Sequence, residues 1–469
     1  MSGPDRDTTH ASATSAGRAR DRSHAGLALA VGSAGFFLIT LDILIVNVAL
    51  TRIGRELGGG TSGQQWVIDG YTLLFASLLL FAGNLADRIG AKRALGMGIV
   101  LFAVTSTACA VAPSLGALIA ARVVQGASAA VMLPASMSLI REAFPDPARR
   151  ARALGVWAVG GAVAGAVGPL LGGLLTTLSW RLVFGINLPV CVIMLALLAR
   201  VATSPRHPAR FDWTGQVLAV LALGSLIAGL VEGGSVGFDD PVVLGALATA
   251  AVATVAFVAV QARVRQPMMP LGLFTHAGVR LALLVGFSFM VGNFGTVFLL
   301  ALYLQQHLGL TPLAAGLYLF PSAIFSIIGN LISGPVTNRF GTRVPVGVGL
   351  ALMTLGVLGM AAVAPLGSPL PVTAFMVLTG GGGALAMPPV SGLVLASVPL
   401  QQAGTASAVF NTFRQVGGAV AIAVFGALVA APHAFVPGLQ LSFVITAVLL
   451  GASALLGFTS RATRPTAAA

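Results

Sequence analysis

Long uncharged runs alternate with short polar segments along nearly the whole chain. Between residues 27 and 459 we count fourteen such runs, each near the ~20 residues that an α-helix needs to cross a bilayer. A helix satisfies its own backbone hydrogen bonds, as a lipid-embedded segment must. The pattern therefore predicts an all-α polytopic membrane protein with fourteen transmembrane helices.

The basic residues set the orientation. Most of the 26 Lys and Arg residues fall in alternate loops and in the tails. The loops on the other side of the membrane contain Arg52, Arg55 and Arg181. Because cytoplasmic loops carry the excess of Lys and Arg, both termini are predicted to be cytoplasmic. Residues 1–26 are rich in Ser, Thr, Ala and Arg, and we expect them to form a disordered cytoplasmic tail.

The second half of the chain repeats the first. Residues 334–343, GPVTNRFGTR, match residues 83–93, GNLADRIGAKR, and the same offset pairs Asp42 with Asn293. A six-helix unit repeated after two extra helices predicts a 6 + 2 + 6 arrangement, in which the halves differ in charge. The predicted parts are the tail 1–26, an N-terminal six-helix bundle 27–201, a linker with two extra helices 202–265, a C-terminal six-helix bundle 266–460 and a cytoplasmic tail 461–469.

Composition excludes several classes of protein. Hydrophobic residues make up 57% and charged residues 8%, which is outside the range of soluble globular proteins. The net charge of +13 does not indicate nucleic-acid binding, because the basic residues lie in loops between membrane spans rather than on one face of a domain. Cys109 and Cys191 both lie in apolar runs, so neither a disulfide framework nor a metal site is expected.

The charged turn after the second run suggests a conformational latch. Its glycines allow two helices to reverse over few residues, and Asp87 can bridge to neighbouring basic residues or to the positive end of a facing helix. The residues of this predicted latch are Gly83, Asp87, Arg88, Gly90, Lys92 and Arg93.

Two charges inside predicted spans lie at a similar depth. Asp42 is about 12 Å and Arg122 about 9 Å from the outer ends of their spans, at 1.5 Å per residue. Ionised groups are costly in lipid, so each needs water or a partner, and the two could pair. Paired, they could load and release a proton near neutral pH. The alternatives are a carboxylate that only ties helices together and an arginine that snorkels to the surface.

Other polar residues inside the spans leave two interpretations open. Asp69 either lines a cavity that attracts cations or sits at the wet interface beside Trp66 and Tyr71. Arg414, flanked by Asn411 and Gln415, has either a substrate or gating role or a structural one. Asn293 is a further candidate for the cavity.

The fifth run carries small residues at helical spacing. Gly161 and Gly165, then Ala164, Gly168 and Gly172, predict a groove for a neighbouring helix, and Pro169 permits a kink. After this run come Trp180, Arg181, Asn187 and Pro189, which we interpret as interface anchors.

These motifs together resemble the major facilitator superfamily. The turn at residues 83–93 resembles its signature loop, and ARVVQGASAA around Arg122 resembles its fourth-helix motif. Fourteen spans, with LDILIVNVAL around Asp42 and GPLLGG from Gly168, resemble its fourteen-helix drug:proton antiporter branch, which includes exporters similar to methylenomycin resistance proteins. The resemblance implies proton coupling through Asp42 and Arg122. It also implies an antiporter-type helix with Gly155, Gly168, Pro169, Gly172 and Gly173.

The sequence therefore predicts a proton-coupled secondary transporter, in a bacterial cell membrane, that exports an amphipathic drug or antibiotic by alternating access. The alternative is a proton-coupled importer of a small metabolite, since the export direction rests on the fifth-helix resemblance. An enzyme is not expected, because no P-loop or HExxH motif is present. The expected partners are a hydrophobic or cationic small molecule, protons and lipid. No nucleic acid and no cofactor are expected, the energy source is the proton gradient, and the protein should act as a monomer.

Overall fold

The computed structural model describes residues 7–206, 211–265, 267–399, 402–430 and 434–459, and these residues form helices without a β-strand. We call α1 to α7 the N-terminal half and α10 to α15 the C-terminal half. The N-terminal half comprises α1 (Asp7–Leu57), α2 (Gly60–Ile89), α3 (Ala91–Ala110), α4 (Leu115–Ala143), α5 (Pro147–Leu178), α6 (Leu182–Gly185) and α7 (Asn187–Ala199). The extra helices are α8 (Trp213–Val236) and α9 (Pro241–Arg263). The C-terminal half comprises η1 (Leu271–Thr275), α10 (Ala277–Leu302), η2 (Tyr303–His307), α11 (Pro312–Phe340), α12 (Arg343–Val363), η3 (Ala364–Leu366), α13 (Pro369–Ala396), α14 (Ala403–Leu428) and α15 (Phe435–Thr459).

The predicted number of membrane spans is confirmed. Fourteen helical segments of the described chain are long and apolar enough to cross a bilayer. One of them joins α6 and α7 (Leu182–Ala199), and another continues α10 through η2 (Ala277–His307). Polar caps begin several helices: Asp146 accepts from the backbone N–H of Arg149 at 2.8 Å at the start of α5, which satisfies one of the free N–H groups of the first turn.

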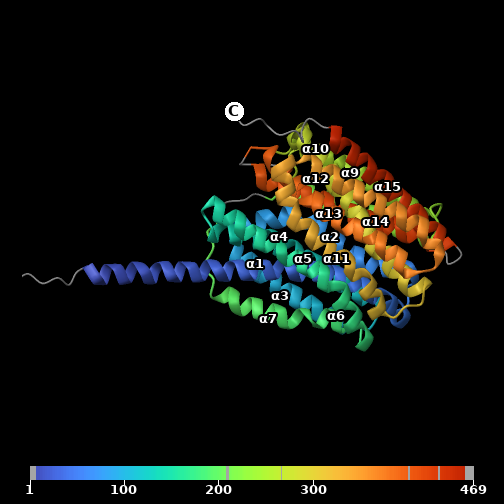
Figure 1. Ribbon diagram of the computed structural model, residues 1–469, viewed down its shortest axis with the longest axis horizontal. Coiled ribbons are helices and arrows are strands. Elements are labelled where there is room, and N and C mark those ends of the chain that lie inside the picture. Colours follow the sequence, from blue (N-terminus) through green and yellow to red (C-terminus); the bar gives the residue numbers. More distant parts are fainter. Residues whose placement is uncertain (1–6, 207–210, 266, 400–401, 431–433, 460–469) are drawn as a thin grey trace, which may run out of the picture.

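The N-terminal segment differs from the expected disordered tail. Residues 7–26 are helical and continue into the first span, so that α1 is 51 residues long and projects from the bundle (Figure 1). Residues 1–6 lie outside the described part of the chain, as do residues 460–469, which include the second predicted tail, 461–469. Ala and Arg favour helix, and the adjoining span removes the cost of starting one.

The two halves lie side by side, with the C-terminal half above the N-terminal half in Figure 1. They meet along two seams, where α5 packs against α11 and where α2 packs against α14. Within the N-terminal half α1 packs on α5 and α4, and within the C-terminal half α10 packs on α14. The offset of the repeat makes α11 the counterpart of α2 and α14 the counterpart of α5, so each seam pairs the second helix of one half with the fifth helix of the other.

The extra helix α8 covers the seam between α2 and α14 from outside. Ile227 and Val231 of α8 share an apolar cluster with Leu73 of α2 and with Ala419 and Ala423 of α14. Near the outer end, Glu232 of α8 accepts a hydrogen bond from the Trp66 indole N–H at 2.8 Å. The two residues are 166 positions apart in the sequence, so neither local sequence indicates this bond. The helix α8 therefore contacts both halves.

Candidate functional site

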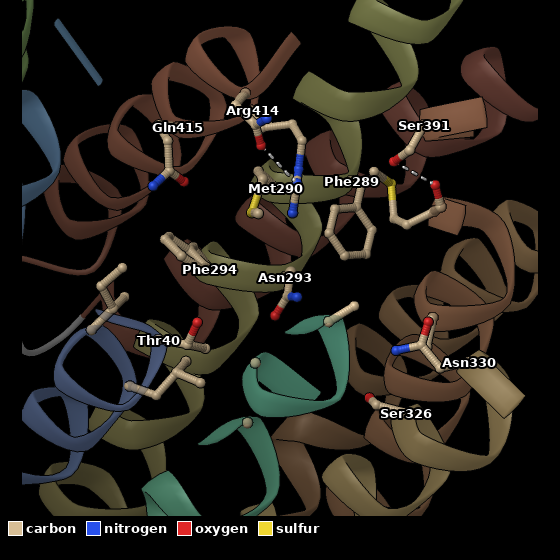
Figure 2. A pocket seen from close by; sticks show the side chains of 18 of the residues that line it. Thr40, Phe289, Met290, Asn293, Phe294, Ser326, Asn330, Ser391, Arg414 and Gln415 are labelled. Carbon is tan, nitrogen blue, oxygen red and sulfur yellow. Dashed lines mark hydrogen bonds between the residues drawn. The ribbon is translucent and has the colours of Figure 1, made fainter. Parts of the chain in front are cut away.

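A central cavity of about 570 Å³ lies between the two halves. Both halves line it, with α1, α2, α4 and α5 on one side and α10, α11, α12, α13 and α14 on the other (Figure 2). It extends to Met137 of α4, Leu395 of α13 and Ser407 of α14, which lie near the cytoplasmic ends of their helices under the predicted orientation. This volume is in the range of sites that bury a drug-sized molecule.

The two walls of the cavity differ in polarity. The wall from the N-terminal half is mostly apolar, and in it Phe36 stacks on Trp157 with ring centroids 4.0 Å apart. The wall from the C-terminal half carries most of the polar groups, which include Asn293, Ser322, Ser326, Asn330, Thr379, Ser391, Ser407, Asn411, Arg414 and Gln415. The structure thus places four of the predicted cavity residues, Asn293, Asn411, Arg414 and Gln415, on one wall.

Asp42 and Arg122 form an ion pair inside the N-terminal half. Arg122 Nη1 lies 2.5 Å from Asp42 Oδ2, and the two side chains are 1% and 0% exposed. Arg122 Nε also donates to the carbonyl oxygen of Val67 at 3.0 Å. Its guanidinium lies 4.3 Å from the centre of the Tyr71 ring. The similar depth of the two residues in the sequence indicates that they could pair, and the structure shows this contact.

Polar side chains from three helices complete the network around the pair. Gln125 of α4 accepts from Arg122 at 2.9 Å and donates to Asp42 Oδ1 at 3.2 Å and to Ser106 at 2.7 Å. Asn187, at the start of α7, donates to Asp42 Oδ1 at 2.8 Å and to Ser106 Oγ at 3.0 Å. The interpretation of Asn187 as an interface anchor was therefore wrong: it is fully buried. Asp42 is 145 residues away in the sequence, so the residues around Asn187 do not indicate this contact.

The ion pair and the cavity are separate sites, but α1 contributes residues to both. Thr40, Ile43 and Leu44 of α1 line the cavity, whereas Asp42 lies on the other side of the same turn, within the N-terminal half. A change of charge at Asp42 can thus reach the cavity through the position of α1, without contact between a bound molecule and the carboxylate.

Asp69 occupies neither of its two predicted places. It is fully buried, and both carboxylate oxygens lack a hydrogen-bond partner among the described residues. It is not a lining residue of the cavity. One helical turn to either side, Gln65 bonds to α14 and Leu73 packs with α8 and α14, so Asp69 lies on the face of α2 turned towards this junction. Both sequence interpretations were therefore wrong, because neither took account of the extra helix that covers this face.

The predicted latch is not engaged in this conformer. Asp87 is exposed and forms no hydrogen bond or ion pair with the described residues. The turn is held instead by the end of α7 and the segment that follows it: Lys92 Nζ donates to the carbonyl oxygens of Ala199 at 3.2 Å and of Val201 at 2.5 Å. Arg88 lies 5.2 Å from the Phe211 ring centre, and Gly90, with φ 90°, supplies the left-handed turn between α2 and α3. The expected bridges of Asp87 to Arg88, Lys92 or Arg93 are therefore wrong for this conformer.

Glutamine side chains bridge the halves at the outer side. Gln65 of α2 donates to the carbonyl oxygens of Ile422 and Ala423 on α14 at 3.0 and 2.8 Å. Gln305 of η2 donates to the carbonyl oxygen of Val48 at 3.1 Å. Gln306 donates to the Gln64 side chain at 3.1 Å. These are the hydrogen bonds between the halves among the described residues, and all lie near outer helix ends. We call them the outer seal.

The small residues of α5 allow close helix contacts on two sides. A Cβ atom at Gly172 would lie 2.8 Å from the carbonyl oxygen of Ile45 in α1, and one at Gly173 would lie 2.7 Å from that of Pro312 in α11. Gly168 faces Leu44, and Pro169 contacts Gly316 of α11 through its carbonyl oxygen. Gly155 has open space at the Cβ position. The predicted groove is confirmed at Gly161, Gly168 and Gly172, which face α1, whereas Gly165 has open space at its Cβ position and lines the cavity.

A sequence profile described as Major Facilitator Superfamily matches residues 32–422. The chain belongs to this superfamily. Major facilitator proteins that the chain resembles include the methylenomycin A resistance protein of Streptomyces coelicolor, 37% identical over 91% of this chain and 90% of that protein. The multidrug resistance protein Stp of Mycobacterium tuberculosis is 37% identical over 86% of this chain and 76% of its own length. The tetracenomycin C resistance and export protein of Streptomyces glaucescens is 35% identical over 86% of this chain and 75% of its length.

Solved major facilitator structures share the fold. A D-xylose–proton symporter superposes with a TM-score of 0.66 at 14% identity, covering 92% of this chain and 96% of that chain. A transporter of the POT family in complex with 5-aminolevulinic acid superposes with a TM-score of 0.69 at 14% identity, covering 93% and 96%. Fourteen apolar helices and bacterial relatives of this kind make the protein a multi-pass protein of the bacterial cell membrane.

Proposed function

We propose that the protein exports an amphipathic antibiotic or drug in exchange for protons, by alternating access of the central cavity to the two sides of the membrane. The resistance and export proteins to which it is similar over most of their length support export. The observation that carries the mechanism is the buried Asp42–Arg122 ion pair, on a helix that also lines the cavity.

The ion pair supplies the proton site in this proposal. Protonation of Asp42 removes its charge and weakens its bond to Arg122. The remaining contacts of the guanidinium are then the carbonyl oxygen of Val67, the side chain of Gln125 and the Tyr71 ring. The network would then rearrange and shift α1, whose other face lines the cavity. The energy source is the proton gradient, with no cofactor, and the working unit is the monomer.

The conformer described here would be the state that loads substrate from the cytoplasm. Its halves are bridged at the outer side by the outer seal, and the cavity extends towards the inner ends of α4, α13 and α14. Export then requires the seal to part and the cytoplasmic ends to close, which would bring Asp87 towards the C-terminal half.

Drug accumulation in bacteria that express the protein tests the proposal. Methylenomycin A and tetracenomycin C, which appear in the names of relatives, are the first compounds to try. Expressing cells should accumulate less of at least one compound and tolerate more of it, and a protonophore should abolish the difference. Asp42→Asn should behave as the empty vector, whereas Asp239→Asn, an exposed acid in an outer loop, should behave as wild type. Uptake driven by an inward proton gradient would favour the importer instead.

A further inference from the structure

The cavity carries one formal charge, and that charge is positive. Arg414 of α14 is the only charged side chain among the described residues that line it. The sequence offers no acid nearby on the same half, because no Asp or Glu follows Asp240. The C-terminal half, which supplies the polar wall, is therefore free of acidic residues throughout its length.

The guanidinium of Arg414 is positioned but not neutralised. Nη1 donates to the Asn411 side-chain oxygen at 3.2 Å, and Nε has no partner among the described residues. Its central carbon lies 5.8 Å from the Phe289 ring centre and 5.7 Å from that of Phe410. Figure 2 shows the side chain reaching from α14 towards Phe289 and Met290. Aromatic faces orient a guanidinium and attract it weakly, but they bring no counter-charge.

The acids of the N-terminal half do not compensate this charge. Asp42 is bound to Arg122, and Asp69 lies off the cavity on the face of α2 towards α14 and α8. The Arg414 side chain is half-buried between the halves. A charge that has lost part of its water and has no ionic partner is unfavourable, and an anion that reaches it recovers part of that energy. Guanidinium groups bind carboxylates in a planar two-point geometry, and the free Nε of Arg414 leaves donors for such a contact.

We infer that the substrate is an amphipathic organic anion, with a carboxylate or similarly acidic group that binds Arg414. Its apolar body lies against the opposite wall, where Phe36 and Trp157 are stacked. The inference rests on the proposed export function and defines its substrate class. It replaces the expectation of cationic substrates, which assumed that the buried acids line the cavity.

Equilibrium binding to the purified protein in lipid nanodiscs at pH 7.0 tests the inference. Three probes share one ring system: 1-naphthaleneacetic acid is anionic, 1-naphthaleneacetamide is neutral and 1-(1-naphthyl)ethylamine is cationic. The acid should bind about tenfold more tightly than the amide, as expected for a charge-assisted hydrogen-bonded pair, and the amine should bind most weakly. Equal binding of all three, tighter binding of the amine or no binding of the acid would overturn the inference.

Two variants identify the group responsible. Arg414→Gln should reduce the affinity for the acid to within twofold of that for the amide and leave the affinity for the amide unchanged. Arg414→Lys should keep part of the preference, because the charge remains and the two-point geometry does not. Arg263→Gln removes the same charge from the exposed end of α9 and should bind as wild type. Loss of preference in Arg263→Gln would assign the effect to net charge and overturn the role of Arg414. If Arg414→Gln does not fold, the wild-type ranking still decides the substrate class.

Efflux of the same three probes separates this inference from the proposed function. If the protein binds the acid preferentially but exports none of the probes and neither antibiotic, the anion site is supported and the proposed export function is contradicted. If the protein exports only the amine, in a proton-dependent way, and binds it most tightly, the proposed export function is supported and the anion site is contradicted.

Discussion

Asp42 and Arg122 lie 80 residues apart in the sequence, and their side chains meet at 2.5 Å in the interior of the N-terminal half. Neither residue lines the central cavity. The place where a proton would act and the place where a substrate would bind are thus distinct, and α1 connects them.

Breaking this ion pair should cost stability as well as transport. Asp42→Asn leaves Arg122 buried without its counter-charge, which should lower the free energy of unfolding by about 3–5 kcal/mol. The double variant Asp42→Asn with Arg122→Gln removes both charges and should recover part of that loss. Thermal unfolding in detergent measures the difference. Both variants should fail in proton-dependent efflux, and a double variant that transports would contradict the coupling role.

Weakening the outer seal should expose the cavity to the outside. Gln65→Ala and Gln305→Ala each remove hydrogen bonds between the halves, at about 1 kcal/mol per bond, so each should raise the outward-open population several-fold. The reporter is a cysteine at Val297, a lining residue of α10, labelled by a membrane-impermeant maleimide. The native Cys109 and Cys191 are buried, so they should contribute little background.

The matched control for the seal is Gln440→Ala. Gln440 also donates to a backbone carbonyl, that of Ala361 at 2.9 Å, but both residues belong to the C-terminal half. Labelling of the reporter should not change in this variant. Equal increases in Gln440→Ala and Gln65→Ala would show that lost stability, rather than lost closure, exposes the cavity.

Closure along the seam between α5 and α11 should depend on Gly173, which has only a hydrogen atom where other residues have a Cβ atom. In Gly173→Ala the new methyl group would meet the Pro312 carbonyl oxygen of α11, so the outer ends of α5 and α11 must separate. Efflux should fall and labelling of the Val297→Cys reporter should rise. Gly155→Ala, in the same helix but with open space at the Cβ position, should retain wild-type behaviour, and a comparable defect there would remove the steric explanation.

Removing the charge of Asp87 should reduce transport without changing the stability of this conformer. Because Asp87 is exposed and has no partner among the described residues, Asp87→Asn should change the free energy of unfolding by less than about 0.5 kcal/mol. Efflux should nevertheless fall, since the carboxylate is expected to contact the C-terminal half when the cytoplasmic side closes. A clear loss of thermal stability would show instead that Asp87 already has a stabilising role in the cytoplasm-open state.

The sequence predicts the features that can be recognised within one membrane span, without knowing which spans are neighbours. Each span stands out by its own composition, and Asp42 and Arg122 stand out because a charge inside such a run needs a partner. Asn187 and Gln125 were missed in their roles because an uncharged amide does not stand out in the sequence as a charge does, and only the fold brings them to the same carboxylate. The outer seal was missed for the same reason. The state of Asp87 could not be predicted, because one sequence serves both conformers.

The lone positive charge at Arg414 also bears on what drives the transport cycle. Exchange of one monovalent anion outward for one proton inward moves two positive charges into the cell, which a membrane potential favours by about 4.6 kcal/mol per 100 mV. Exchange of a monovalent cation for one proton moves no net charge. An anion exporter of this kind would therefore continue to work in alkaline surroundings, where the pH difference vanishes but the electrical potential remains.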